Sequence, residues 1–291
     1  MKEKFQNPQT VIRWLFAGFT VICLLAAVLV SDRGGMLDGL VRICTQSGQT
    51  VKSYFDPSYG GFSGTFLNVA LVCAVCLGLY CLPGISTRYR DREASVQAVS
   101  DALAALARAK VGNYLAFFPS YAYLRQVYED FTARYPDIGT LAQESGLDDA
   151  ARAAFLEQFG PSPAKTLLGF GVMGGIFGEG VDLVGDRLIG CAIVGVGLPQ
   201  VNPRQEILGR YYEEQSGCGF DYAYRYPGMN KVLQAAGRVV RTPQDKGVVL
   251  LLDDRFAQPD TARLFPPHWQ HIRYLPGTAA LEAALKGFWD V

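Results

Sequence analysis

Four long polar side chains recur at helical spacing in the mainly apolar segment 229–241. They are separated by three, four and three residues in turn: Lys231, Gln234, Arg238 and Arg241. This spacing places all four on one face of a predicted helix, whose other positions are mainly Val, Leu and Ala. Guanidinium groups form bidentate hydrogen bonds to phosphate oxygens, so the pattern predicts a phosphate-binding cleft. The alternative is that the arginines form ordinary salt bridges to Asp253 and Asp254.

Strands and helices are expected to alternate around this segment. Short apolar runs bounded by glycine or polar residues predict buried strands within residues 113–120, 166–175, 188–197 and 246–254. Helical periodicity predicts helices over residues 92–110, 121–135, 148–159 and 229–241. Strands rich in Val, Leu and Ile that alternate with helices are typical of a parallel sheet with helices on both faces. We therefore expect an α/β domain over residues 84–291.

The loops expected at the carboxyl ends of these strands carry the unusual residues. Parallel α/β sheets bind their ligands at that edge. Pro119, Ser120 and Tyr121 follow one predicted strand, and the glycine-rich segment 176–186 follows the next. Together with the arginine-bearing helix, these loops predict a single polar edge at which a ligand binds.

The charge balance excludes one class of function. The chain has 27 basic and 27 acidic side chains, and 49% of its residues are hydrophobic. A protein that binds nucleic acid through its overall basicity carries a large positive excess. Any site for a polyanion in this chain must therefore be local, made by a few placed side chains.

Three segments taken together resemble a known family. The sequences GNYLAFFPSY, GGIFGEGVDL and QAAGRVVR, at residues 112–121, 174–183 and 234–241, resemble the fourth, fifth and sixth motifs of superfamily two helicases, in the form found in DinG-like and XPD-like DNA helicases. ISTRYRDRE and KGVVLLLDDRF also match, and the motifs follow the family's order and spacing over about residues 84–291. The resemblance implies a RecA-like parallel sheet, the second and C-terminal motor domain of an ATP-dependent DNA helicase.

The resemblance implies a set of nucleotide contacts. Gln234 and Arg238 would approach the γ-phosphate, and Arg241 would be the arginine finger that stabilises charge on the transferred phosphoryl group. The fifth motif would contribute the turn beside the nucleotide, through Glu179, Gly180 and Asp182. Capping of a helix N-terminus is the alternative role for the two acidic residues of this turn. The implied cofactor is ATP with magnesium.

The same resemblance implies a set of DNA contacts. Ser120 and Tyr121 would touch a single strand, the tyrosine by stacking or through its hydroxyl. Thr87 and Arg88 would contact its backbone. The Gly174–Gly175 pair would let backbone amides approach a DNA phosphate or the nucleotide. The implied partner is single-stranded or forked DNA.

Parts of the motor that the family requires do not occur in this sequence. It contains no GxxxxGK[ST] phosphate loop, no Asp-Glu-x-His box for magnesium and no four-cysteine iron–sulfur insertion. In this family the nucleotide lies between two motor domains, so we expect a first motor domain to be a partner and the chain to be inactive alone. Cys73, Cys76 and Cys81 lie in an apolar run and are interpreted as packing residues, so no metal ligand is predicted.

Two uncharged apolar runs precede the predicted domain. Residues 14–30 and 61–82 carry no charged side chain, and a bilayer core requires about 20 apolar residues. We therefore predict two transmembrane helices, at about 12–31 and 61–82, in a membrane segment 1–83 that contacts the lipid bilayer. A signal peptide for the first run, or buried core helices, are the alternatives. Basic residues on both outer flanks predict a membrane-anchored chain with a cytoplasmic helicase domain.

Two classes of function stay open from the sequence. In the first, the chain is the C-terminal motor half of a helicase and supplies the arginine finger and part of the groove for single-stranded DNA. In the second, it is a non-catalytic, membrane-anchored module that binds nucleic acid or nucleotide. A fusion of two gene fragments near residues 82–85 is a further alternative, because the first 83 residues do not follow the family pattern.

Overall fold

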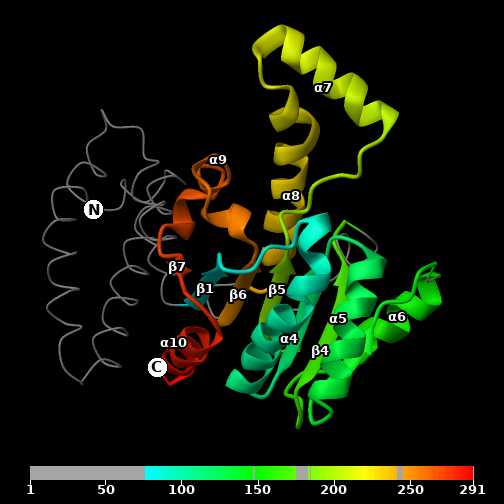
Figure 1. Cartoon of the computed structure of the whole chain (residues 1–291). Coiled ribbons are helices and arrows are strands. Elements are labelled where there is room, and N and C mark those ends of the chain that lie inside the picture. Colours follow the sequence, from blue (N-terminus) through cyan, green and yellow to red (C-terminus); the bar gives the residue numbers. More distant parts are fainter. Residues whose placement is uncertain (1–75, 147, 175–182, 184, 241–244, 291) are drawn as a thin grey trace, which may run out of the picture. The chain divides into compact units, whose positions relative to one another are not determined.

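A parallel β-sheet forms the centre of the domain. The computed structural model describes residues 76–146, 148–174, 183, 185–240 and 245–290, all within the compact unit Val72–Val291. In this described part the sheet has seven strands in the order β3-β4-β2-β5-β6-β1-β7, and every strand pair is parallel (Figure 1). The strands are β1 (Leu77–Leu82), β2 (Asn113–Phe118), β3 (Gly139–Ala142), β4 (Leu167–Val172), β5 (Gly190–Val194), β6 (Gly247–Leu252) and β7 (Arg273–Tyr274). The predicted parallel α/β sheet is confirmed, and its four predicted strands are β2, β4, β5 and β6.

Strand β1 corrects the prediction of a second membrane span. Leu77–Leu82 is buried along its whole length and pairs with β6 on one side and β7 on the other. The last six residues of the predicted span 61–82 are therefore a strand of the sheet, and the α/β domain begins before residue 84. A strand buried on both faces is a continuous apolar run, so hydropathy alone does not separate it from the end of a span.

The rest of the membrane prediction falls outside what the structure describes. The first predicted span, 12–31, and residues 61–75 of the second belong to the undescribed part of the chain. Among the described residues, every helix is too short or too polar to cross a bilayer.

Helices pack on both faces of the sheet, as predicted. The longer helices are α4 (Arg92–Ala109), α5 (Tyr121–Arg134), α6 (Asp149–Glu157), α7 (Pro203–Ser216), α8 (Tyr226–Ala236) and α10 (Thr278–Trp289). One core lies beneath α4, α5 and α10, and the other lies beneath α6 and α8. Alternate residues of β1 show the division, because Tyr80 and Leu82 enter the first core while Leu79 and Cys81 enter the second.

Short helical turns complete the connections. They are η2 (Tyr89–Asp91), η3 (Gly185–Arg187), the π-helical turn η4 (Asp221–Arg225), η5 (Asp254–Ala257), α9 (Pro259–Ala262) and η6 (Pro267–Trp269). Two of them, η2 and η5, follow β1 and β6 closely, so they bring charged residues to the strand ends. The sequence had not predicted these turns.

Helix α7 projects from the domain and had not been predicted either. Asn202 caps its N-terminus by accepting from the backbone of Gln205, and Gly217 ends it with a φ of 65° in the left-handed region. None of its residues is buried, and Figure 1 shows it extending away from the sheet before η4 returns the chain to α8. We call residues 201–225 the arm.

Helix α8 ends earlier than the spacing of its polar residues predicts. Its last residue is Ala236, and the backbone amides of Arg238 and Val239 bond to carbonyls only three residues earlier. This tighter turn buries Val239 next to Gly247, the first residue of β6. Arg238 therefore lies beyond the helix, and the predicted continuous helix through residue 241 is wrong. Packing of a β-branched side chain under the next strand outweighs the helical spacing.

Candidate functional site

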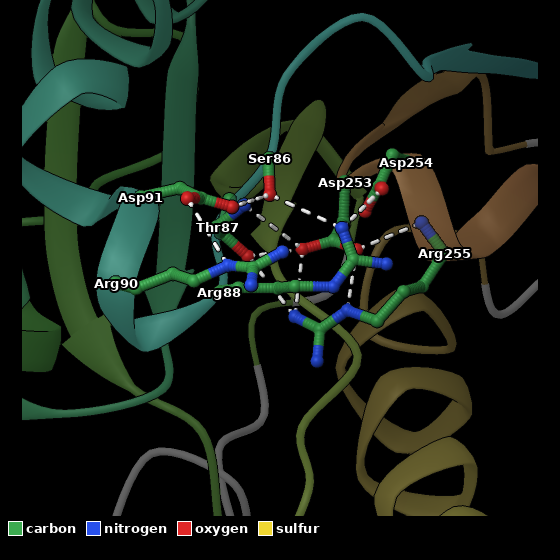
Figure 2. Close-up of polar contacts among 8 residues, drawn as sticks. All are labelled: Ser86, Thr87, Arg88, Arg90, Asp91, Asp253, Asp254 and Arg255. Carbon is green, nitrogen blue, oxygen red and sulfur yellow. Dashed lines mark hydrogen bonds and ion pairs between the residues drawn. The ribbon is translucent and has the colours of Figure 1, made fainter.

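The carboxyl ends of five strands meet at one edge of the sheet. Leu82, Leu252 and Val194 lie in register at the ends of β1, β6 and β5, and Phe118 pairs with Val172 at the ends of β2 and β4. The segments that follow these ends are residues 83–88, 119–121, 173–174, 195–198 and 253–255. We call this region the carboxyl edge, and part of it is drawn in Figure 2.

Asp253 is the centre of the hydrogen-bond network in Figure 2. Its side chain is 0% exposed. Its Oδ1 accepts from the backbone amide and Nε of Arg255, at 2.8 and 2.7 Å. Its Oδ2 accepts from Nη2 of Arg255 at 2.8 Å, and from the amide of Thr87 at 3.2 Å as well as the Thr87 hydroxyl. The carboxylate thus ties the loop after β1 to the loop after β6.

The charge state of Asp253 follows from these contacts. Burial raises its pKa, but the hydrogen bonds and the positive charge of Arg255, with the hydrogen bond from Thr87, act in the opposite direction and prevail. The pKa of Asp253 therefore lies below its usual range, and the group is a buried carboxylate at neutral pH.

Both polar donors of Thr87, its backbone amide and its hydroxyl, bond to Asp253 in this network. Thr87 is 1% exposed, and its hydroxyl is so close to Gly195 that a Cβ at that glycine would lie 2.8 Å from it. Gly195 has a φ of 84°, a conformation that side chains disfavour. This burial argues against the direct DNA contact predicted for Thr87. Its hydroxyl instead links the segment after β1 to Asp253 and Arg255 after β6, and packs beside Gly195.

Arg88, in contrast, reaches the surface. Its Nη1 donates to Ser86 Oγ at 3.3 Å and forms an ion pair with Asp254, and about a third of each charged side chain is exposed. Ser86 Oγ in turn donates to Asp91 Oδ2 at 2.7 Å. The hydrogen bond to Asp254 raises the pKa of Arg88. Arg88 keeps the accessibility that a DNA backbone contact needs, although Asp254 offsets its charge.

Ser120 and Tyr121 form the start of α5. Ser120 is the N-cap, and its Oγ accepts from the amide of Tyr123 at 3.4 Å. Tyr121 is 36% exposed, and its hydroxyl accepts from Nε2 of Gln143 at 2.8 Å. Gln143 is 3% exposed, and its Oε1 accepts from the amide of Val172 at 2.8 Å. The ring of Tyr121 is therefore held in place through its hydroxyl from the end of β4.

Arg92 completes this part of the carboxyl edge. Its Nη1 donates to Ser120 Oγ at 3.3 Å, and its guanidinium lies over the rings of Tyr89 and Tyr123, 5.5 and 5.3 Å from their centroids. Burial lowers the pKa of Arg92, and the charge of Arg255 acts in the same direction. A half-buried guanidinium next to a second arginine suits an anionic group.

The turn after β4 packs directly on α8. Gly174 has a φ of 70°, and a Cβ there would lie 3.0 Å from Cε of Lys231. Lys231 lies on α8 three residues before the sixth motif, so this contact joins the start of the fifth motif to the helix that carries Gln234. The other predicted residues of the fifth motif, Gly175, Glu179, Gly180 and Asp182, lie outside the described residues.

Two further residues of the predicted polar face, Gln234 and Arg238, lie away from the carboxyl edge. Helix α8 starts beside β5, where a Cβ on Gly228 would lie 2.6 Å from the carbonyl oxygen of Val196, and leads to Val239 beside the first residue of β6. A helix between parallel strands must run back against them. Exposed Gln234 and half-buried Arg238 therefore approach the amino ends of the strands.

Two predictions about this segment need revision. The expectation that all three polar loops share one edge is wrong for Arg238, because α8 leads it toward the opposite end of the sheet. Arg241, the predicted arginine finger, lies outside the described residues. The alternative was that the arginines of this segment form salt bridges to the two aspartates after β6. In the structure Asp253 pairs with Arg255, and Asp254 pairs with Arg88.

Two thiols lie in strands. Cys81 in β1 and Cys191 in β5 are both 0% exposed, and burial raises the pKa of Cys81 to about 12. Among the described residues, no group of three His, Cys, Asp or Glu side chains could hold a metal ion. These thiols are packing residues of the sheet.

Three curated relatives are helicases by name. The chain is 28% identical over 197 residues to regulator of telomere elongation helicase 1 of Bos taurus, and 29% identical over 205 residues to the same protein of Homo sapiens. It is 27% identical over 215 residues to ATP-dependent DNA helicase CHL1 of Coccidioides immitis. These matches cover 60%, 63% and 62% of this chain but only 16%, 17% and 24% of the relatives. The chain thus corresponds to less than a quarter of each.

Two solved structures share the fold. XPD_APO aligns with a TM-score of 0.55 at 19% identity, covering 68% of this chain and 40% of that one. XPD_Helicase aligns with a TM-score of 0.54 at 20% identity, covering 68% and 35%. The Helicase C-terminal domain family matches residues 103–272, which is more than half of the chain. The described α/β domain therefore has the RecA-like fold of XPD-type helicases, and the chain belongs to the Helicase C-terminal domain family.

Proposed function

We propose that this chain is the second motor domain of an ATP-dependent DNA helicase, which completes an ATPase site with one surface and holds single-stranded DNA with another. The observation that carries the proposal is the course of α8. Through Lys231 the helix packs on Gly174 at the carboxyl edge, and beyond its other end lies Arg238. A rigid element in contact with both candidate surfaces can transmit a shift of one to the other.

The donors beside α8 fit the phosphate part of ATP. Gln234 presents an exposed amide, and Arg238 a half-buried guanidinium on the turn that follows the helix. Both are donors suited to phosphate oxygens, and neither is a ligand for a hard cation. Since the described residues include no acidic cluster for a metal, magnesium in this proposal is held by the first motor domain. When bound, ATP supplies the phosphoryl group whose transfer drives the motor.

Within that site each residue has a separate task. Gln234 and Arg238 orient the γ-phosphate, and Arg241 stabilises the charge that develops during phosphoryl transfer. Gly180 and its acidic neighbours in the fifth motif, Glu179 and Asp182, shape the turn that follows β4. The contact of Gly174 with Lys231 supports this, because it places the start of that turn against the helix that precedes Arg238.

The carboxyl edge supplies the DNA surface. Tyr121 is the exposed aromatic ring for stacking, and Ser120, Arg88 and Arg92 offer hydroxyl and guanidinium donors to the strand's phosphates. The N-terminus of α5 at Ser120 adds a favourable dipole. Gly174 and Gly175 allow close approach of the backbone. Thr87 holds the loops beneath this surface, in place of the direct contact first expected.

Catalysis in this proposal requires a first motor domain. Neither the donors of α8 nor those of the carboxyl edge can hold magnesium or activate water, and no phosphate loop occurs in the sequence. The chain alone is therefore expected to bind DNA without hydrolysing ATP.

The DNA surface is tested by fluorescence anisotropy of the full chain with labelled single-stranded DNA. Because few side chains meet phosphates, the slope of log affinity against log salt should be small, about −1 to −2. Tyr121→Ala should weaken binding by about fivefold or more through the loss of one stacked base. Tyr274→Ala is the matched control, since Tyr274 is 44% exposed on β7, four strands along the sheet from β2, which precedes Tyr121. Equal losses in the two variants, or affinity that salt does not change, would contradict the assigned surface.

A further inference from the structure

A small cavity opens beside the carboxyl edge, where the arm joins the domain. It has a volume of about 120 Å³ and lies between the start of η4, the loop after β5 and the segment after β6. An apolar cavity of about 150 Å³ accommodates a benzene molecule. The space is therefore of the size of one six-membered ring, and a fused two-ring system would not enter it completely.

The walls of this cavity suit a flat ring. Phe220 of the arm is 52% exposed, and its ring stacks on that of Tyr224, with centroids 5.4 Å apart and an angle of 26°. Val196, Leu198 and Met229 form the apolar part of the lining. An aromatic ring that is already held by a neighbour loses little freedom on stacking with a ligand.

The charges in the walls are already compensated. Arg225 pairs with Asp221 and, at 3.4 Å, with Asp260. Arg255 pairs with buried Asp253 at 2.7 Å. Two paired guanidinium groups attract an isolated phosphate weakly, but their remaining N–H groups still suit a neutral heterocycle. The site therefore favours an uncharged polar ring over an anion.

Gln258 supplies a polar group with both hydrogen-bonding capacities. Its side chain is exposed at the cavity, and among the described residues its side-chain amide makes no hydrogen bond to another protein group. An amide carries an acceptor and a donor side by side. Pyrimidine bases present the complementary pair on their Watson–Crick edge.

We propose that this cavity is a subsite for a single pyrimidine base, which stacks on Phe220 and pairs with the amide of Gln258. This subsite rests on the proposed DNA-binding function and extends the DNA surface, because Arg255 connects the cavity to Thr87 and Asp253 at the carboxyl edge. A pyrimidine base that turns out of a DNA strand bound at that edge has the size and polarity to fit the cavity. The base of a free pyrimidine nucleotide has the same chemistry.

The test measures binding of the full chain to two labelled oligonucleotides of about 12 nucleotides, oligo-dT and oligo-dA, by fluorescence anisotropy. Wild type should bind oligo-dT more tightly by about fivefold to tenfold, and Phe220→Ala should remove that preference. Gln258→Ala should reduce the preference and leave oligo-dA affinity unchanged. Tyr211→Ala is the matched control, because Tyr211 is a 56% exposed aromatic ring elsewhere on the arm. It should behave as wild type.

Each outcome separates this subsite from the DNA surface itself. Binding of both oligonucleotides with equal affinity, or a preference that survives Phe220→Ala, overturns the subsite and leaves the DNA surface standing. Absence of binding to either overturns both. Competition by thymidine 5′-monophosphate that depends on Phe220 identifies free nucleotide as an occupant, whereas competition by oligo-dT alone identifies the strand.

Discussion

Replacement of Asp253 by Asn is the perturbation that examines the carboxyl edge most closely. The side chain of Asp253 is 0% exposed and accepts five hydrogen bonds from Thr87 and Arg255. Asn keeps the shape but loses the charge, and its NH₂ group would face donors. The Arg255 side chain, 20% exposed, would be left without its partner carboxylate.

The expected cost follows from this burial. Removal of one partner of a buried ion pair costs about 3–5 kcal/mol, because the remaining charge stays desolvated. Arg255 keeps some access to water, so we expect the lower end, about 3 kcal/mol. For a domain of this size that corresponds to a fall in Tm of roughly 6–12 °C.

The neighbouring aspartate provides the matched control. Asp254 pairs with Arg88, but their side chains are 31% and 32% exposed, so Asp254→Asn should cost no more than about 1 kcal/mol. Equilibrium urea unfolding of the full chain, followed by far-ultraviolet circular dichroism, measures both variants. A loss below about 1 kcal/mol for Asp253→Asn, or equal losses for the two, would refute the reasoning about burial.

Three further predictions concern stability and the placement of Tyr121. The pKa of Asp253 is lower in the folded chain than its ordinary value of 3.8, so its contribution is complete above that pH and is lost as pH falls through the folded pKa. In urea unfolding over a pH series, the difference in free energy of unfolding between wild type and Asp253→Asn should thus shrink only below about pH 4; a difference that disappears near neutral pH would contradict this. Gln143→Leu should weaken single-stranded DNA binding by disordering Tyr121, and a double-mutant cycle with Tyr121→Phe should be non-additive because both changes remove the same hydrogen bond; full additivity would show that Gln143 acts elsewhere. Gly228→Ala should lower the free energy of unfolding by about 1–3 kcal/mol, since its Cβ would lie 2.6 Å from a backbone oxygen, whereas Gly287→Ala, with open space around it in α10, should be neutral or stabilising by up to about 1 kcal/mol. Similar losses of stability for the two variants in urea unfolding would contradict the close packing of α8.

The buried strands show where sequence patterns were sufficient. Strands β2, β4, β5 and β6 were predicted because each is a short apolar run with glycine or polar residues at its ends. The same rule failed for β1, because Leu77–Leu82 continues a longer apolar run without a break. Only its pairing with β6 and β7, residues far away in the sequence, distinguishes it as a strand.

The candidate site shows a similar division. Tyr121 is exposed as a contact residue must be, but its support by Gln143 depends on a pairing of β3 with β4 that no local pattern reveals. Thr87 carries a hydroxyl that suits DNA, yet a partner 166 positions away buries it. Tertiary contacts of this kind decide whether a polar residue is available to a ligand.

Arg238 and Arg92 show two limits of helical spacing. Spacing correctly placed Lys231 and Gln234 on α8, but it did not predict that Val239 would turn the chain under β6 and end the helix. Arg92 lay within a segment that matched the family, and its role became visible only from its contacts with Ser120 and two tyrosine rings.

Single-turnover ATP hydrolysis by a reconstituted pair tests the central claim most directly. The full chain is mixed with a first motor domain that carries the phosphate loop, and nucleotide affinity is measured separately. We predict that the chain stimulates hydrolysis, that Arg241→Ala lowers stimulated turnover by roughly 10³-fold or more while nucleotide binding persists, and that Arg241→Lys restores little of it. Arg263→Ala, a 54% exposed arginine paired with Asp221, serves as control and should leave turnover unchanged. Stimulated hydrolysis that is undiminished by Arg241→Ala would contradict the account.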